Sequence, residues 1–310
     1  MNKAQELHDL GQSLWLDNIT REILDNGTLR RYINEFSITG LTSNPTIFDE
    51  AIGNTAAYDE GIRAKAKVGK SGEALFMELA LEDLRRAADL FRPVFDATDG
   101  VDGWVSMEVS PLLANDTAGS VAAAEAYLRG IERRIAARRD PRVASVASLF
   151  VSRWDKAVGD KVPPELRNRL GIAIGGRTYR AYRELLASPR WKKLAAAGAR
   201  PQRLLWASTG TKDPKASDTL YVEALAAPDT IDTMPEKTLR AFAEHGQIKG
   251  VMAEDGGDAE AILAKFVKAG IDTDALGLQL QRDGAQAFTK SWQELMTRIA
   301  DKSDALAHAG

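Results

Sequence analysis

The sequence predicts an α/β fold of the (β/α)8 TIM-barrel type that is shortened by two βα units. Short apolar segments of strand length alternate with longer helical patterns, and this alternation is typical of parallel sheets built from βαβ units. The motifs GxGxxG and GxxxxGK[ST] are absent, which favours a closed barrel over an open nucleotide-binding sheet. Six strand segments can be counted, whereas a complete barrel has eight, so two are missing.

The six predicted strands are runs of mainly apolar residues of strand length. In chain order they are Ser13–Asp17, Ile38–Thr42, Gly103–Ser110, Val143–Val151, Leu204–Thr209 and the most weakly patterned, Thr230–Met234. A helical pattern follows each strand, and the clearest of these patterns cover residues 71–91, 163–188 and 235–246. Both Pro164 and Pro235 stand where proline favours the first turn of a helix.

The two missing strands are expected between the third and fourth predicted strands. In residues 114–141, apolar side chains recur at spacings of three and four, as on one face of a helix: Val121, Ala124, Leu128, Ile131 and Ile135. The pattern predicts one uninterrupted amphipathic helix there, with no strand inside it. Because no linker divides the chain, we expect a single domain over residues 1–310 with an internal deletion near residues 117–130.

The composition is that of an ordinary globular protein and excludes several classes of function. Of 310 residues, 44% are hydrophobic and 27% are charged, and the net charge of -3 predicts no surface for nucleic acid. The absence of cysteine excludes disulfides, thiolate metal sites and a cysteine nucleophile. No signal peptide or membrane span is predicted, so we expect a cytoplasmic protein. The scattered His8, His245 and His308 argue against a histidine triad or zinc cluster.

Polar residues near the ends of the first three strands are candidates for catalysis, since a barrel places its site where its strands end. Asp17 ends the first strand, and Thr42 and Asn44 end the second. Glu108 lies inside an apolar segment, and strand alternation directs it toward the barrel interior. A carboxylate in that setting suits proton transfer, although it can equally serve to satisfy neighbouring backbone groups.

Residues near the ends of the fourth and fifth strands suit a phosphate. Ser148, Phe150 and Arg153 combine a hydroxyl, an aromatic ring and a guanidinium group that can form paired hydrogen bonds to phosphate. An arginine after a strand is also commonly a surface ion pair. Ser208 and Lys212 lie in the segment ASTGTKDP, which suits phosphate binding or forms an ordinary polar turn.

Taken together, these segments resemble the transaldolase family. The resemblance is carried by SLWLDNI around Asp17, SITGLTSNPTIF over residues 37–48, SMEVSPLLANDT around Glu108, and SVASLFVSRWD around Ser148 and Arg153. It extends from the N-terminus to the C-terminal helices apart from one gap. The segments TSNP and SMEVSP are its most specific parts.

The resemblance implies a closed barrel of the class I aldolase type and a transferase of the pentose phosphate pathway without metal or organic cofactor. In that family, a lysine on the fourth strand forms a Schiff base with a ketose phosphate. Aldol cleavage leaves a dihydroxyacetone unit on the lysine, and this unit is passed to an aldose phosphate. The implied partners are therefore ketose and aldose phosphates, with no nucleic acid and no membrane.

The resemblance also implies a role for each candidate residue. Proton transfer falls to Asp17 and Glu108, and positioning of the bound intermediate and a water falls to Thr42 and Asn44. The residues that would hold the substrate, by the same resemblance, are Ser148, Phe150, Arg153, Ser208 and Lys212.

The segment that would carry the reactive lysine is missing from this sequence. By the resemblance, the family's fourth and fifth strands should fall between Asp116 and Arg142, where one helical pattern stands instead. A Schiff-base lysine must lose its proton, which requires a desolvated pocket or a neighbouring cation. Lys212 alone lies near a predicted strand end, and no feature of the sequence indicates that it reaches the reacting carbon. We therefore expect little or no turnover.

Three functions stay open at this point. The chain is a transaldolase with impaired or absent activity, a sugar-phosphate-binding barrel without covalent chemistry, or an incomplete barrel that does not close. Strand number, tilt and shear are linked in a barrel, so the loss of two strands would expose sheet edges. A homo-oligomer would cover those edges.

Overall fold

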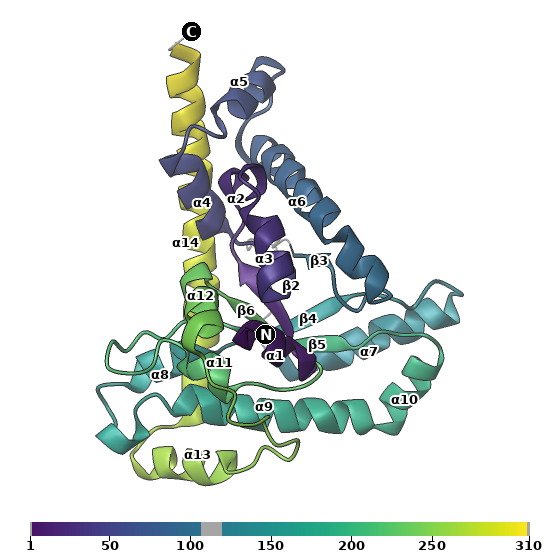
Figure 1. Cartoon of the computed structure of the whole chain (residues 1–310), viewed down its shortest axis with the longest axis vertical. Helices are drawn as coiled ribbons and strands as arrows, with labels where there is room; N and C mark the ends of the chain where they lie inside the picture. The colour runs from purple at the N-terminus through teal and green to yellow at the C-terminus, as the bar shows by residue number, and fades with distance from the viewer. Residues whose placement is uncertain (1, 107–119, 309–310) are drawn as a thin grey trace. The chain divides into compact units, whose positions relative to one another are not determined.

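The structure is a computed structural model of the chain, and it describes residues 2–106 and 120–308 (Figure 1). The chain forms two compact units. Unit 1 comprises Met1–Ser13 and Asp116–Gln281, and unit 2 comprises Leu14–Asn115 and Arg282–Gly310. The last helix, α14 (Thr273–His308), contributes residues to both units. The single domain expected over residues 1–310 stays a prediction.

Unit 2 contains three parallel strands in the order β3-β2-β1. The strands are β1 (Ser13–Asp17), β2 (Ile38–Thr42) and β3 (Trp104–Val105). Its helices are α2 (Arg21–Asp25), α3 (Thr28–Phe36), α4 (Pro45–Asn54), α5 (Asp59–Lys67), α6 (Gly72–Ala97) and the part of α14 after residue 281. Gly40 of β2 leaves no room for a side chain between the neighbouring strands. A Cβ at this position would lie 2.6 Å from Trp15 Nε1 and 2.7 Å from the carbonyl oxygen of Trp104.

The core of unit 2 joins its helices through aromatic side chains. Phe48 of α4 packs edge-on against Phe76 of α6 at 5.2 Å, and Phe76 packs in the same way against Trp292 of α14 at 5.5 Å. Trp292, Leu295 and Ile299 are all buried and recur at spacings of three and four, so one face of α14 belongs to this core. The C-terminal helix is therefore part of the packing of unit 2.

Unit 1 contains the other three described strands, which are parallel and run in the order β6-β5-β4. They are β4 (Ser145–Phe150), β5 (Gln202–Ala207) and β6 (Thr230–Met234). The helices of unit 1 are α1 (Lys3–Asp9), α7 (Ser120–Ala136), α8 (Val151–Val158), the 3-10 helix η2 (Pro164–Leu166), α9 (Leu170–Ala187), α10 (Pro189–Ala196), α11 (Leu220–Ala224), α12 (Glu236–His245), α13 (Ala259–Lys268) and the first part of α14. A core of aromatic and aliphatic residues, with Tyr179 and Trp206 fully buried, lies between β5 and these helices.

The described strands and helices confirm the α/β class with parallel strands. β1, β2 and β6 have the predicted bounds, and α7 is the uninterrupted helix expected after the third strand, over the residues described. The third predicted strand is observed as Trp104–Val105, and the rest of its predicted range from residue 107 lies outside the described residues. No described helix combines the length and the apolar character needed to cross a bilayer.

β4 spans Ser145–Phe150 instead of the predicted Val143–Val151, and β5 begins at Gln202 instead of Leu204. Two further predicted boundaries are wrong for local reasons. β5 ends at Ala207 instead of Thr209, because Ser208 adopts a left-handed φ of 57°, which turns the chain out of the strand. The helix predicted from residue 163 begins at Leu170 as α9, after the short η2. Its start is fixed by the buried Asp155, whose carboxylate accepts hydrogen bonds from the first N–H groups of α9.

Candidate functional site

The predicted residues of unit 2 lie together at the ends of its strands. Asp17 and Thr42 are opposite one another in the β1–β2 ladder, each as the last residue of its strand. Thr42 Oγ1 donates a hydrogen bond to Asp17 Oδ1 at 2.8 Å, and both residues are half-buried. This contact fixes the orientation of a carboxylate at the strand ends, which is where an enzyme of this fold keeps its proton-transfer groups.

Asn44 follows Thr42 by two residues and begins α4. Its Oδ1 accepts a hydrogen bond from the backbone N–H of Ile47 at 3.0 Å, and Pro45 occupies the first position of the helix. The cap uses the side-chain oxygen, so a contact between Asn44 and a substrate would come from the Nδ2 amide group. The preceding Ser43 is buried and donates to the carbonyl oxygen of Ser106 at 2.8 Å, which ties this turn to the residue after β3.

Glu108, the second predicted proton-transfer residue, lies outside the described residues.

The predicted residues around β4 in unit 1 also lie together. Ser148 is exposed on β4, and Phe150 is the last residue of that strand. α8 starts directly afterwards, so Arg153 stands in its first turn, with the guanidinium carbon 4.1 Å from the centre of the Phe150 ring. Contact with the aromatic face restricts the positions that the guanidinium group can take.

The turn after β5 is joined to the start of α8. The backbone N–H of Ser152 donates to the carbonyl oxygen of Ser208 at 3.2 Å, which links the residue next to Arg153 with a second predicted site residue. Lys212 is exposed, and its Nζ lies 3.8 Å from the position that a Cβ on Gly210 would occupy. Unit 1 therefore brings the predicted hydroxyl, guanidinium and ammonium groups to neighbouring strand ends.

Two buried acids of unit 1 were not predicted from the sequence. Asp232 of β6 is 0% exposed, and burial raises its pKa to about 7, against a hydrogen bond from Thr209 that lowers it. Asp155 of α8 is also buried, and burial raises its pKa although Tyr221 and two backbone N–H groups donate to it. An acid at the centre of the strand TIDTM was a readable signal for Asp232, whereas nothing in the local sequence indicates the role of Asp155.

None of the chain's lysines lies on a strand or is buried, and all of them fall within the described residues. Three are partly buried, and each forms ion pairs with acids: Lys3, Lys65 and Lys302. The hydrogen bond from Lys65 to Glu82 raises the pKa of this lysine. An ion pair of this kind stabilises the protonated ammonium group, which cannot attack a carbonyl carbon.

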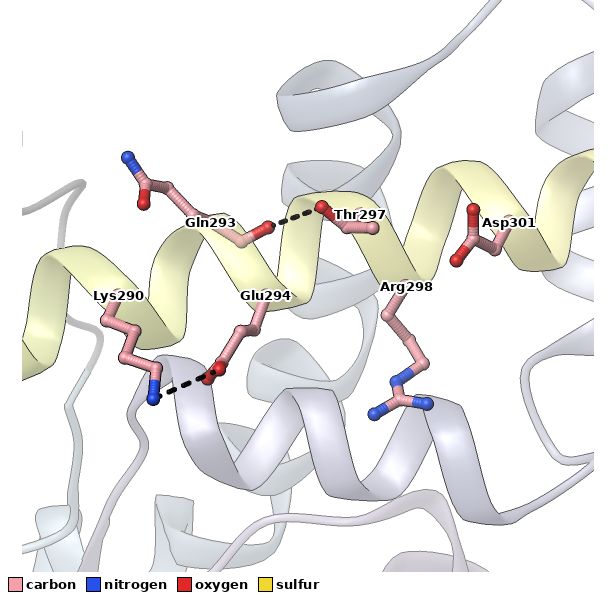
Figure 2. Close-up of a pocket in the computed structure, with 6 residues that line it drawn as sticks. All are labelled: Lys290, Gln293, Glu294, Thr297, Arg298 and Asp301. Atoms are coloured by element: carbon pink, nitrogen blue, oxygen red, sulfur yellow. Dashed lines mark hydrogen bonds and ion pairs between the residues drawn. The ribbon is translucent and has the colours of Figure 1, made fainter.

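The surface hollows of unit 2 are separate from the candidate residues. Figure 2 shows one of about 350 Å³, lined by six residues of α14 alone: Lys290, Gln293, Glu294, Thr297, Arg298 and Asp301. A second, of about 370 Å³, is lined by Arg21, Glu82, Asp83, Arg85 and Arg86. None of the eight predicted residues that the structure describes lines either hollow. Among the described residues, no cluster of three His or acidic side chains has the arrangement of a metal site.

Parallel strands that each lead into helices, with polar side chains where the strands end, are the features of α/β barrel enzymes. The sequence matches the transaldolase/fructose-6-phosphate aldolase family over residues 14–138 and 132–299. The chain belongs to this family, whose members are transferases and aldolases acting on sugar phosphates.

Curated relatives align over almost the whole chain. A transaldolase from Saccharopolyspora erythraea is 38% identical over 361 aligned positions, which cover 98% of this chain and 98% of the relative. A transaldolase from Thermobifida fusca is 39% identical, with 96% of this chain and 97% of the relative covered. A third, from Thiobacillus denitrificans, is 36% identical, with 96% and 100% covered.

Proposed function

We propose that this chain is a transaldolase-type protein that binds ketose and aldose phosphates of the pentose phosphate pathway but is inactive or strongly impaired in transferring the dihydroxyacetone unit. The observation that carries the proposal is the placement of the lysines, none of which lies on a strand or is buried. An exposed ammonium group keeps its proton at neutral pH, and the Schiff base requires the neutral amine. We propose a cytoplasmic location with it, which the absence of cysteine favours.

Two features of the comparisons support the loss of a strand-bearing segment. The family match falls into two stretches that meet at residues 132–138, at the end of α7. The alignment with the S. erythraea transaldolase runs over 361 positions, more than the 310 residues of this chain, so it contains positions where this chain has no residue. These features are those expected when two βα units are deleted and the helices on either side are joined.

The remaining candidate residues support binding of a phosphorylated substrate. The hydrogen bond from Thr42 orients the Asp17 carboxylate at the strand ends, where it would act on a substrate hydroxyl or a water. In unit 1, Arg153 and the N–H groups at the start of α8 supply positive charge where a phosphate would be held. With Glu108, these residues would have the roles that the family resemblance gives them.

A non-catalytic sugar-phosphate-binding protein is the second candidate function. The stacking of Arg153 on Phe150 favours it, because this arrangement prepares an anion site that does not depend on the missing lysine. The two candidate functions differ in whether the chain still transfers the dihydroxyacetone unit. Lys212 is the residue that would have to carry such residual transfer, since it is the lysine nearest to a candidate strand end in the chain.

Binding and turnover measured side by side test the proposal. Calorimetry with fructose 6-phosphate is expected to show binding, while an assay with fructose 6-phosphate and an aldose phosphate acceptor shows transfer at least a thousandfold slower than by the T. fusca relative. Slow transfer that Lys212→Ala abolishes would favour impaired catalysis, and no transfer at all would favour the binding function. Transfer at the rate of the relative would contradict both.

A further inference from the structure

Asp232 is a buried acid that the proposed chemistry does not use. It lies in the middle of β6 beside Trp206 of β5, and it is fully buried. Its Oδ1 lies 2.9 Å from Thr209 Oγ1, and its Oδ2 has no hydrogen-bond partner among the described residues. A carboxylate ion left in that state would be costly, because neither a cation nor a second donor replaces the water that it has lost.

Two other buried acids, Asp83 and Asp155, show how this chain satisfies such a group. Asp83 forms an ion pair with Arg21 at 3.0 Å, and Asp155 accepts two backbone N–H groups and the hydroxyl of Tyr221. Asp232 has a single threonine hydroxyl instead. Its environment therefore suits a neutral carboxylic acid, and burial raises its pKa to about 7 in agreement.

The geometry around Thr209 points to the same state. Its Oγ1 lies 2.9 Å from Asp232 Oδ1 and 3.1 Å from the carbonyl oxygen of Thr233. A threonine hydroxyl has one proton, so it can donate to only one of these acceptors at a time. Both contacts become hydrogen bonds at once if Asp232 carries a proton on Oδ1 and donates it to Thr209, which in turn donates to Thr233.

The hydrogen bonds of Thr209 determine the path of the candidate substrate-binding turn. Thr209 is fully buried and directly follows Ser208, whose left-handed φ of 57° is unfavourable for a residue with a side chain. The turn also packs on the start of α12, since a Cβ on Gly210 would lie 3.3 Å from Thr238 Oγ1 and 3.4 Å from Pro235 Cγ. Thr209 is the side chain that ties this turn to β6.

We propose that Asp232 is a positioning residue, held as a neutral acid, whose proton completes a chain of hydrogen bonds through Thr209 to the Thr233 carbonyl and so fixes the turn of residues 208–212. The part of this inference that concerns ligand binding rests on the proposed function, in which Ser208 and Lys212 contact the sugar phosphate. The hydrogen-bond chain itself can be tested without a ligand.

Infrared spectroscopy tests the neutral acid directly. The difference spectrum between wild type and Asp232→Asn at pH 6 is expected to contain the carbonyl band of a protonated, hydrogen-bonded carboxylic acid. The other buried acids are present in both proteins, so their bands cancel in the difference spectrum. A difference spectrum that shows the loss of a carboxylate band instead would overturn the proposal.

Two matched variants test the positioning role. Thr209→Val removes the hydroxyl from the proposed chain, and Thr230→Val removes a buried hydroxyl of the same strand region that bonds to Ala227 and Gln12. Both variants lose a buried hydrogen bond, so both lose stability. Thr209→Val alone is expected to speed amide hydrogen exchange in residues 208–212 about tenfold and to weaken binding of fructose 6-phosphate about tenfold.

The outcomes separate this inference from the proposed function. Equal exchange in residues 208–212 of the two variants would overturn the positioning role. If the wild type binds no fructose 6-phosphate, the proposed function fails, and the exchange and infrared results still decide on the hydrogen-bond chain. Asp232→Asn provides rescue, because its amide can donate to Thr209, and it is expected to keep both exchange and binding within twofold of the wild type.

Discussion

Arg153 stands in the first turn of α8, where a positive side chain is opposed by the positive end of the helix dipole. Its contact with the Phe150 ring offsets part of this cost. A bound phosphate would reverse the sign of the local interaction, since the helix start and the guanidinium group would then attract the same anion. The position of Arg153 is thus compatible with the binding of an anion at this helix start.

Replacing Arg153 should therefore reduce affinity with little effect on folding. Arg153→Ala is expected to weaken fructose 6-phosphate binding by about 2 to 3 kcal/mol, roughly 30- to 150-fold, because a charge-assisted pair of hydrogen bonds is lost. The affinity of Arg153→Lys should lie between those of the wild type and Arg153→Ala, since lysine keeps the charge without the planar group. Arg190→Ala, which removes an exposed ion pair with Glu132, is the control in calorimetry and should change affinity less than twofold. Equal losses in both alanine variants would remove Arg153 from the site.

Asp232 also predicts how stability depends on pH. Its pKa is raised in the folded state to about 7 from 3.8, so the folded protein binds a proton more tightly than the unfolded chain does. The tighter binding of this proton stabilises the folded protein fully below pH 4. Roughly 4 kcal/mol of this stabilisation is lost as the pH rises toward 7. Urea unfolding of wild type and Asp232→Asn between pH 4 and 8 should show their stabilities diverging over this window. Parallel curves would mean that Asp232 is ionised in the folded protein.

At the scale of elements, sequence periodicity predicted the strands and most helices but not their junctions. β1, β2 and β6 were predicted with their bounds, because β1 and β2 end at polar residues and Pro235 follows β6. The start of α9 was missed because it depends on Asp155, which is distant from it in sequence. Asp17 and Thr42 were predicted to lie at strand ends, and the structure adds the hydrogen bond between them. Asp232 was missed because its strand was the weakest pattern.

The C-terminal helix α14 gives an element-scale prediction for stability. Trp292 is 3% exposed and packs on Phe76, and Leu295 and Ile299 of the same face are fully buried. Trp292→Ala should lower the free energy of unfolding by about 3 to 5 kcal/mol through loss of buried area and creation of a cavity. Gln293→Ala, one position along on the exposed face, should change it by less than about 0.5 kcal/mol. Similar losses in urea unfolding for both variants would contradict the packing of this face.

At the scale of the whole molecule, the edge strand β4 bears on the state of assembly. Among the described strands it has one neighbour, β5, and its residues Ser145–Phe150 carry no charge, with Ala147 and Ser148 exposed. Such a strand favours pairing with a second copy. Ala147→Lys should shift the chain toward the monomer in analytical ultracentrifugation, and Ala195→Lys on the exposed face of α10 should not. No change with Ala147→Lys would show that β4 does not mediate association.

The proposed function requires that the chain retains a transaldolase-type binding site without an efficient nucleophile. The measurement that tests it most directly is the intact mass of the protein after incubation with fructose 6-phosphate and borohydride, which reduces a Schiff base to a stable adduct. We expect no adduct on this chain and complete labelling of the T. fusca transaldolase under the same conditions. Labelling of this chain as complete as that of the T. fusca protein, mapped to a lysine such as Lys212 and absent from its alanine variant, would contradict the proposal and establish a working nucleophile.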